Sequence, residues 1–218
     1  TATAATTTTV ALTCAQGGSC AVGDTGPGGG LVFYVHDDAD DLFTCGATLA
    51  STCKYLEVAP NTWDGGSADP TKLWAVVAHQ SSDIATIAND STAYNDALGI
   101  GLGYKNSEAI VDQGNDTTTA AGAARAYGGG SKSDWYLPTT AELNLLCQWA
   151  RDVVQSVTTP CTGGTLNTGT GASGGFSAGS YWSSSENDAG DAWSQRFDNV
   201  NQRASAKYDA RYVRPVRA

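Results

Sequence analysis

The sequence predicts an α+β fold built from short strands, two main helices and long loops stapled by disulfides. Three observations lead to this prediction. Strand-like runs come first, helical runs occupy the middle, and the last third alternates aromatic residues with small and polar ones without a helical period. This order differs from the regular alternation of strand and helix that is expected of a parallel α/β sheet.

The first part of the chain carries two strand signals. The apolar run Leu31–Val35 follows a turn-rich segment, Gly23–Gly30. Because that glycine run leads into a strand, and no Lys and Ser or Thr follow it, we expect a backbone turn and not a phosphate loop. A second strand is expected over residues 55–60, where Pro60 ends it.

Helical sequence occupies the middle of the chain. It begins at Ser107, is interrupted at Gly114 and continues over residues 117–127, whose small side chains allow close packing on a sheet. The glycines at residues 128–130 are expected to end this helix.

A short strand and a second helix are predicted next. Residues 133–138 form the strand, and Thr140 is expected to cap a helix that ends near Val154. The stretch over residues 162–175 is almost entirely Gly, Thr, Ser and Asn, which predicts a long surface loop.

Charge and hydropathy exclude several classes of partner. The formal net charge is -10, so nucleic acid is not expected as a partner, because phosphate binding needs clustered Lys and Arg. No run of 18 apolar residues occurs, so we expect no membrane span. The chain starts with Thr1 and contains no Met, which favours a secreted product whose leader has been removed.

Basic residues gather near the end of the chain. Half of the 12 Lys and Arg residues fall in the last 23 positions. We expect them to neutralise the acidic body by pairing with nearby aspartates, and the alternative is a basic patch that faces a ligand. The six basic residues are Arg196, Arg203, Lys207, Arg211, Arg214 and Arg217, and the aspartates are Asp188, Asp191, Asp198 and Asp209.

Six cysteines predict a disulfide framework. Sequence alone permits 15 pairings of six cysteines, but nearest-neighbour pairing is the simplest, because each pair then brackets a loop rich in Gly, Ser or Thr. Metal ligation is the weaker alternative, since no Cys-x-x-Cys spacing occurs. Disulfides favour an oxidising compartment outside the cytoplasm. The expected pairs are Cys14 with Cys20, Cys45 with Cys53, and Cys147 with Cys161.

We expect a short N-terminal arm and one main domain. Residues 1–20 form the Thr-rich arm or linker, and residues 21–218 form the domain. Three interpretations of residues 1–13 stay open: a flexible linker, an O-glycosylated stalk, or an edge strand that pairs with a neighbouring subunit.

Four aspartates follow the first predicted strand. Carboxylate oxygens are the ligands that calcium prefers, but the spacing does not match an EF-hand loop, so the alternative is a solvated loop. No other cofactor is expected. The four residues are Asp37, Asp38, Asp40 and Asp41.

Several blocks of sequence, in the same order, resemble the bacterial DUF1566 domain found at the C-terminus of the Legionella collagen-like adhesin. The resemblance covers roughly residues 22–218 and implies a C-type-lectin-like fold with short twisted antiparallel strands, related to that of the formylglycine-generating enzyme. It also implies a secreted or surface protein that is used in adhesion, often as an oligomer. The blocks lie at residues 23–35, 55–60, 120–127, 134–146, 181–186 and 212–217.

The chain departs from that family in two respects. The Legionella adhesin recognises sulfated polysaccharide, which calls for positive charge, whereas this chain is acidic. No collagen-like Gly-x-y repeat is present either. Residues 186–211 also resemble the hypervariable segments that diversity-generating retroelements write into proteins of this fold.

A binding role is favoured over catalysis. The chain has two histidines, and the run Ser183–Ser185 is not a Gly-x-Ser-x-Gly elbow, so we expect no enzyme. Trp182 and Trp193 are expected in the core, while nearby polar and aromatic residues display a binding face. The predicted ligand-binding residues are Tyr181, Glu186, Asn187, Asp188, Gln195, Asp198, Asn199, Asn201, Arg203 and Tyr208.

Function is therefore predicted as an extracellular or cell-surface adhesion module that binds a glycan or a protein. The alternative is a structural subunit of an extracellular filament or surface assembly, in which residues 1–13 join one subunit to the next.

Overall fold

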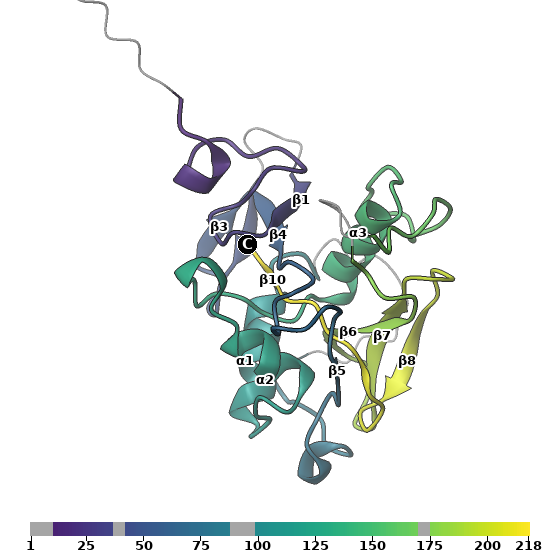
Figure 1. The fold of residues 1–218 in the computed structure, drawn as a ribbon. Helices are drawn as coiled ribbons and strands as arrows, with labels where there is room; N and C mark the ends of the chain where they lie inside the picture. Colours follow the sequence, from purple (N-terminus) through teal and green to yellow (C-terminus); the bar gives the residue numbers. More distant parts are fainter. Residues whose placement is uncertain (1–10, 37–41, 88–98, 170–174) are drawn as a thin grey trace, which may run out of the picture.

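The structure is a computed structural model that describes residues 11–36, 42–87, 99–169 and 175–218. It is α+β, as predicted, with helices α1 and α2 on one side of the molecule and the largest sheet, which has five strands, on the other (Figure 1). Within the described residues three α-helices form, where two main helices were expected, because the helical sequence on either side of Gly114 folds into two separate helices. The helices are α1 (Gly103–Asp112), α2 (Ala120–Ala126) and α3 (Thr140–Ala150).

Two sheets and a hairpin organise the strands. A three-stranded sheet has the order β1-β4-β10, and a five-stranded sheet has the order β5-β9-β6-β7-β8. The first contains β1 (Leu31–Val35), β4 (Tyr55–Val58) and β10 (Val216–Arg217), and β2 (Phe43–Cys45) pairs with β3 (Ser51–Cys53). The second contains β5 (Thr71–Lys72), β6 (Ser180–Glu186), β7 (Asp191–Arg196), β8 (Gln202–Ala206) and β9 (Arg211–Tyr212).

Strand β1 has the bounds that the sequence predicted. The strand expected over residues 133–138 is reduced to a single bridge, in which Tyr136 and Val216 exchange hydrogen bonds of 2.8 and 2.9 Å. This segment therefore closes the outer edge of β10 and does not continue as a full strand.

Helix α3 begins with a capping box. Thr139, one residue earlier than expected, is the N-cap, and its hydroxyl accepts a 3.2 Å hydrogen bond from the Glu142 amide. The Glu142 carboxylate accepts a 2.9 Å bond from the Thr139 amide in return. The helix ends at Ala150, before Val154, whose side chain is exposed.

The glycine-rich turn before β1 binds a buried carboxylate. Glu57 of β4 accepts hydrogen bonds from the amides of Gly28 and Gly30, at 3.1 and 2.7 Å. A Cβ atom at Gly30 would lie 2.1 Å from the Val58 carbonyl oxygen, so only glycine fits this close approach. The glycine run is a turn, as expected. The anion that its amides bind is the Glu57 carboxylate of the same chain.

The core has two parts, and the last third of the chain runs through both. One part packs α3 against β1, β4 and the aromatic residues Phe176, Tyr181 and Phe197. The other gathers the tryptophans Trp63, Trp74, Trp135 and Trp182 with the small residues of α2. Strands β6 to β10 are therefore integral to the domain.

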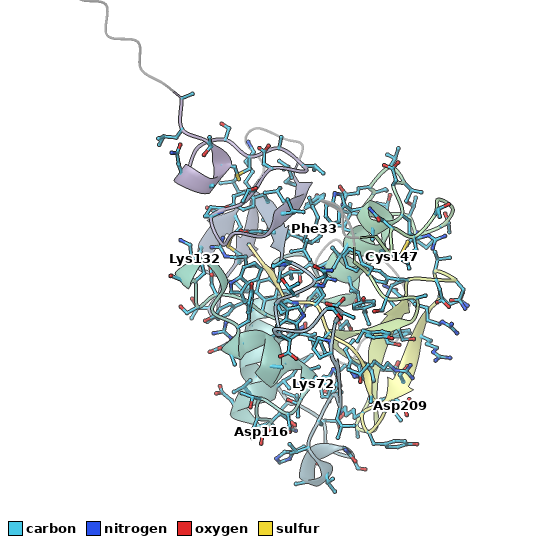
Figure 2. All side chains as sticks on the ribbon, viewed as in Figure 1. Phe33, Lys72, Asp116, Lys132, Cys147 and Asp209 are labelled. Carbon is cyan, nitrogen blue, oxygen red and sulfur yellow. A yellow bond between two sulfur atoms is a disulfide. The ribbon has the colours of Figure 1, made fainter. Side chains whose placement is uncertain are left out.

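All three nearest-neighbour disulfides form, and no cysteine is free. Cys147 on α3 lies in the interior, bonded to Cys161 at the end of the loop that follows the helix (Figure 2). Cys14 and Cys20 close a small loop around the 3₁₀ turn η1 (Cys14–Gln16). Each disulfide is expected to stabilise the fold by about 2–3 kcal/mol through restriction of the unfolded chain.

Candidate binding surface

The predicted ligand residues come from strands β6, β7 and β8 of the five-stranded sheet and from the turns at its two opposite ends. The turn between β6 and β7 lies beside the turn between β8 and β9, since the amide of Lys207 donates a 3.0 Å hydrogen bond to the Gly190 carbonyl. The turn between β7 and β8 lies at the other end of β8, which is five residues and therefore about 17 Å long. Asn187, Asp188 and Tyr208 thus lie far from Asp198, Asn199 and Asn201, and they form no single face.

Three of the predicted ligand residues are buried. Tyr181 and Glu186 have an exposed fraction of 0 %, and Gln195 has 1 %. In this structure these three side chains lie beneath the surface of the sheet. The Tyr181 hydroxyl donates a 2.6 Å hydrogen bond to Asp69, whose carboxylate also receives the Arg214 guanidinium at 2.8 Å.

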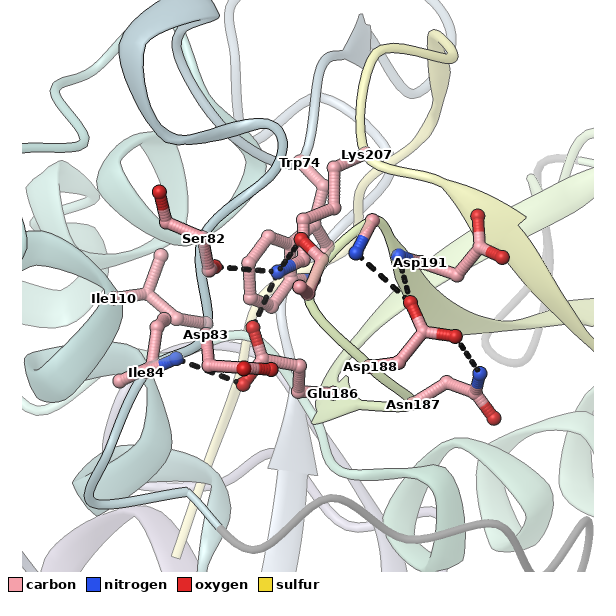
Figure 3. Close-up of polar contacts among 12 residues, drawn as sticks. Trp74, Ser82, Asp83, Ile84, Ile110, Glu186, Asn187, Asp188, Asp191 and Lys207 are labelled. Carbon is pink, nitrogen blue, oxygen red and sulfur yellow. Dashed lines mark hydrogen bonds and ion pairs between the residues drawn. The ribbon is translucent and has the colours of Figure 1, made fainter.

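Glu186 forms a fully buried ion pair with Lys207 (Figure 3). All three ammonium hydrogens of Lys207 have acceptors, because its Nζ also donates to the carbonyls of Ser82 at 2.9 Å and Ala189 at 2.8 Å. The other Glu186 oxygen accepts a 3.0 Å bond from the Ile84 amide. The pair joins the segment over residues 82–84 to both turns at this end of the sheet.

The side chain of Asp188 shapes the β6–β7 turn by binding the groups of neighbouring residues. Its Oδ1 accepts hydrogen bonds from the amides of Gly190 and Asp191, at 2.8 and 2.9 Å, and its Oδ2 accepts the Asn187 side-chain amide at 2.9 Å (Figure 3). Short-range bonds of this kind are typical of Asx turns. The carboxylate is exposed but already has these three donors.

The β7–β8 turn is supported by two buried side chains. Arg151 donates to the carbonyls of Phe197 and Asp198, at 2.6 and 3.3 Å, and the side-chain amide of Gln195 donates to Val200 at 2.8 Å. Val200 has a φ of 62°, a conformation that is rare for a β-branched residue. The turn is therefore fixed from beneath in one strained conformation.

We call residues 198–203, which run from this turn into β8, the display segment. Asn199, Asn201 and Arg203 are all exposed. Arg203 and Asn201 make no side-chain hydrogen bond or ion pair among the described residues. Tyr208, which is 65 % exposed, follows the opposite end of β8. Its neighbour in sequence, Asp209, lies at the edge of the molecule in Figure 2.

Basic residues of the tail divide between local and distant partners. Arg196 pairs with Asp198, and Arg211 pairs with Asp209 at 2.6 Å, as expected. The hydrogen bond from Arg196 holds the pKa of Asp198 below its ordinary value. Other partners lie far away in sequence: Lys207 pairs with Glu186, Arg214 with Asp69, and Arg217 with Glu57 and Asp134.

A concave site lies elsewhere on the molecule. A pocket of about 370 Å³ is lined by Tyr104, Tyr136, Asp134 and the Cys45–Cys53 disulfide. The Asp134 carboxylate already binds the Arg217 guanidinium at 2.9 and 2.7 Å. None of the predicted ligand residues lines this pocket.

The predicted calcium ligands Asp37, Asp38, Asp40 and Asp41 lie outside the described residues, as do residues 1–10 of the arm. Among the residues that the structure does describe, no group of His, Cys, Asp or Glu side chains is arranged to hold a metal. The longest α-helix in the same part of the chain has 11 residues, and none could cross a membrane.

The sequence profile of the Lcl C-terminal domain matches residues 74–217, which is well over half of the chain. The chain belongs to the Lcl C-terminal domain family. The match contains α1 to α3, strands β6 to β9 of the five-stranded sheet and every predicted ligand residue, while β5 lies just before it. The blocks at residues 23–35 and 55–60 lie outside it, and the C-type-lectin-like fold implied by the resemblance stays a prediction.

Lcl domains belong to a family that is associated with bacterial surfaces, and three disulfides fit an extracellular protein. No curated protein matches the chain. The boundary predicted near residue 20 stays a prediction, since the matched range begins well after it.

Proposed function

We propose that this Lcl-family chain is a non-enzymatic adhesion module that binds a glycan or a protein through its display segment. One observation carries the proposal: the segment is supported from below, while Asn199, Asn201 and Arg203 are exposed, and the side chains of Asn201 and Arg203 have no partner among the described residues. A rigid loop with free polar groups loses little conformational entropy when it binds.

The chemistry of the display segment suits a polar ligand. Two carboxamides offer both donors and acceptors, and the Arg203 guanidinium offers donors only. Such groups recognise the hydroxyls of a sugar or the backbone of a protein. The partner contacts would lie on an open surface, without the enclosure that chemistry on a substrate usually needs.

Two features support a role without catalysis. The six cysteines are bridged, so they offer no thiolate as a nucleophile. The buried carboxylates Glu57, Asp69 and Glu186 are each bound by a basic side chain and by backbone or aromatic donors, which makes them structural.

The test replaces Asn201 and Arg203 with alanine together. Labelled protein is applied to an array of neutral, sialylated and sulfated polysaccharides and to immobilised matrix proteins. We expect binding to the best target to fall by roughly tenfold or more, as at interface hot spots, with an unchanged melting temperature. Lys132→Ala is the control, since it also removes one positive charge and lies on the other side of the molecule from β8 (Figure 2).

Equal loss of binding in both variants would mean that charge alone matters. Unchanged binding in the double variant would exclude the display segment as the binding site.

A second role is favoured by a separate observation. Leu12, which directly follows the Thr-rich run, is 61 % exposed. An apolar side chain next to an uncharged, β-prone segment suits contact with another subunit, so the chain is also proposed as a subunit of an extracellular assembly joined through residues 1–13.

A further inference from the structure

Three of the four edge strands in the two larger sheets are closed. The turn before β1 covers its edge, with Gly23 donating to Val32 and Val32 to Asp24, at 2.8 and 2.9 Å. The bridge from Tyr136 covers β10. Strand β5 has only two residues, and the adjoining Leu73 accepts a 2.8 Å bond from the Ala120 amide.

Strand β8 is the open edge. Two backbone hydrogen bonds flank β8: the Arg196 amide donates to the Asn201 carbonyl, and the Lys207 amide donates to the Gly190 carbonyl. In an antiparallel ladder every second residue directs its backbone groups to the neighbouring strand, so the residues between them in this alternation direct theirs away from β7. The outward groups are the amides of Gln202, Ala204 and Ala206 and the carbonyls of Gln202 and Ala204. None of them has a hydrogen-bond partner within the described ranges.

Side chains along this edge leave room for another strand. Ala204, at its centre, is exposed and small, and β8 contains no proline and no bulge in its register with β7. Arg203 is the single charged side chain on the strand.

The chain itself carries a segment that suits this edge. Residues 1–13 contain only Thr, Ala, Val and Leu, with no charge, glycine or proline. The run Thr6–Val10 consists of β-branched residues, which favour strands, and it matches the five residues of β8 in length. In an extended conformation Val10 and Leu12 fall on one face, so docking would cover the exposed Leu12.

We infer that strand β8 is the acceptor for residues 6–12 of a second copy of this chain, which add a sixth strand to the sheet. The inference deepens the assembly role proposed above by naming the surface that receives the arm.

Geometry favours exchange between copies over docking within one copy. The arm is anchored at η1, and β8 lies on the opposite side of the molecule (Figure 1). Val10 can lie at most about 14 Å from Cys14, since four residues span at most that distance. A chain of this size has a radius of gyration of about 17 Å, so its opposite sides are about 40 Å apart.

This contact is heterologous, because the arm of one copy meets a different surface of the next. Repetition therefore produces a ring or an open filament and not a closed twofold dimer.

Complementation between two variants tests the inference. Deletion of residues 1–12 removes the donor and leaves Thr13, the N-cap of η1. Ala204→Pro removes the outward amide at the centre of the acceptor. By light scattering after size exclusion we expect the wild-type chain to assemble, each variant to be monomeric, and their mixture to form a one-to-one heterodimer that grows no further.

Ala204→Ser is the matched control, since it keeps the amide and should assemble like the wild-type chain. Assembly of Ala204→Pro at the wild-type concentration would overturn β8 as the acceptor and leave the assembly role intact. A wild-type chain that stays monomeric would instead overturn the assembly role itself.

A second measurement covers the case in which Ala204→Pro does not fold. A synthetic peptide of residues 1–13 is added to the protein that lacks residues 1–12, and amide hydrogen exchange is followed. Slower exchange over residues 202–206 is expected, and protection that appears elsewhere or nowhere would overturn the inference.

Discussion

The hydroxyl of Tyr136 donates a 3.1 Å hydrogen bond to the buried carboxylate of Glu142. The same carboxylate accepts the Gly101 amide at 2.8 Å and caps helix α3 through the Thr139 amide. Unlike Glu57, Asp69 and Glu186, it has no basic partner among the described residues. It therefore joins the start of α3 to Tyr136 and to Gly101 without a neutralising charge.

Burial raises the pKa of Glu142 to about 7, against the opposing hydrogen bonds from Thr139 and Gly101. Because the folded state holds this proton more tightly than the unfolded state, stability is fully present below about pH 4.5 and is lost as the pH rises towards 7. Glutamine does not titrate, so the Glu142→Gln variant should not show this pH-dependent decrease in the free energy of unfolding, which is on the order of 3 kcal/mol in the wild-type protein.

Urea unfolding at pH 4.5 and pH 7, the two pKa values that bracket the transition, measures this effect. The burial of Asp69 also raises its pKa, so the wild-type curve contains more than one group, and the difference between variant and wild type isolates Glu142. Parallel pH curves for the two proteins would contradict the prediction.

Removal of Lys207 should strongly destabilise the domain. Lys207→Met leaves the buried Glu186 carboxylate without its counter-ion, which costs about 3–5 kcal/mol in comparable buried pairs. The double variant Glu186→Gln with Lys207→Met should recover part of that loss. Chemical denaturation of both proteins provides the check, and equal stabilities of the two would show that the charge is not the cause.

Loss of the Cys147–Cys161 disulfide should lower stability by about 3 kcal/mol, as the closed loop of 14 residues predicts. Both cysteines are buried, so replacement by alanine leaves a small cavity at most. The comparison is with the double alanine variant of Cys14 and Cys20. The disulfide removed there closes a shorter loop, so that variant should lose less stability. Calorimetric melting of the two variants gives the order.

Gly30→Ala should destabilise the domain by more than about 2 kcal/mol, because the new Cβ would meet the Val58 carbonyl and displace the turn from Glu57. Gly128→Ala is the control: nothing lies within 4 Å of a Cβ at that position, and its change should stay within about 0.5 kcal/mol. A variant at Gly30 as stable as the wild type would mean that the turn can shift freely.

Local sequence was sufficient for several elements. The bounds of β1 follow from an apolar run between turn residues, and the start of α3 was placed within one residue by its capping pattern. The burial of Trp182 and Trp193 was also predicted correctly. Helix ends were less predictable, because α3 stops where the packing ends, at Ala150, and not where the helical sequence does.

The candidate site was only partly predictable for a physical reason. Glu186 and Asp188 are two residues apart and equally polar, but the first is fully buried and the second is exposed. What separates them is Lys207, which reaches Glu186 across the neighbouring turn. No spacing in the sequence signals such a contact.

The sequence alone determined the bounds of β1, the start of α3 to within one residue and the three disulfide loops, because these depend on residues within a few positions of one another. Only the tertiary structure decided where the buried charges find partners, since Asp69 and Arg214 are 145 residues apart and Glu57 and Arg217 are 160 apart. It also decided that β8 has an open edge among the described residues, because an edge depends on which strands lie beside it.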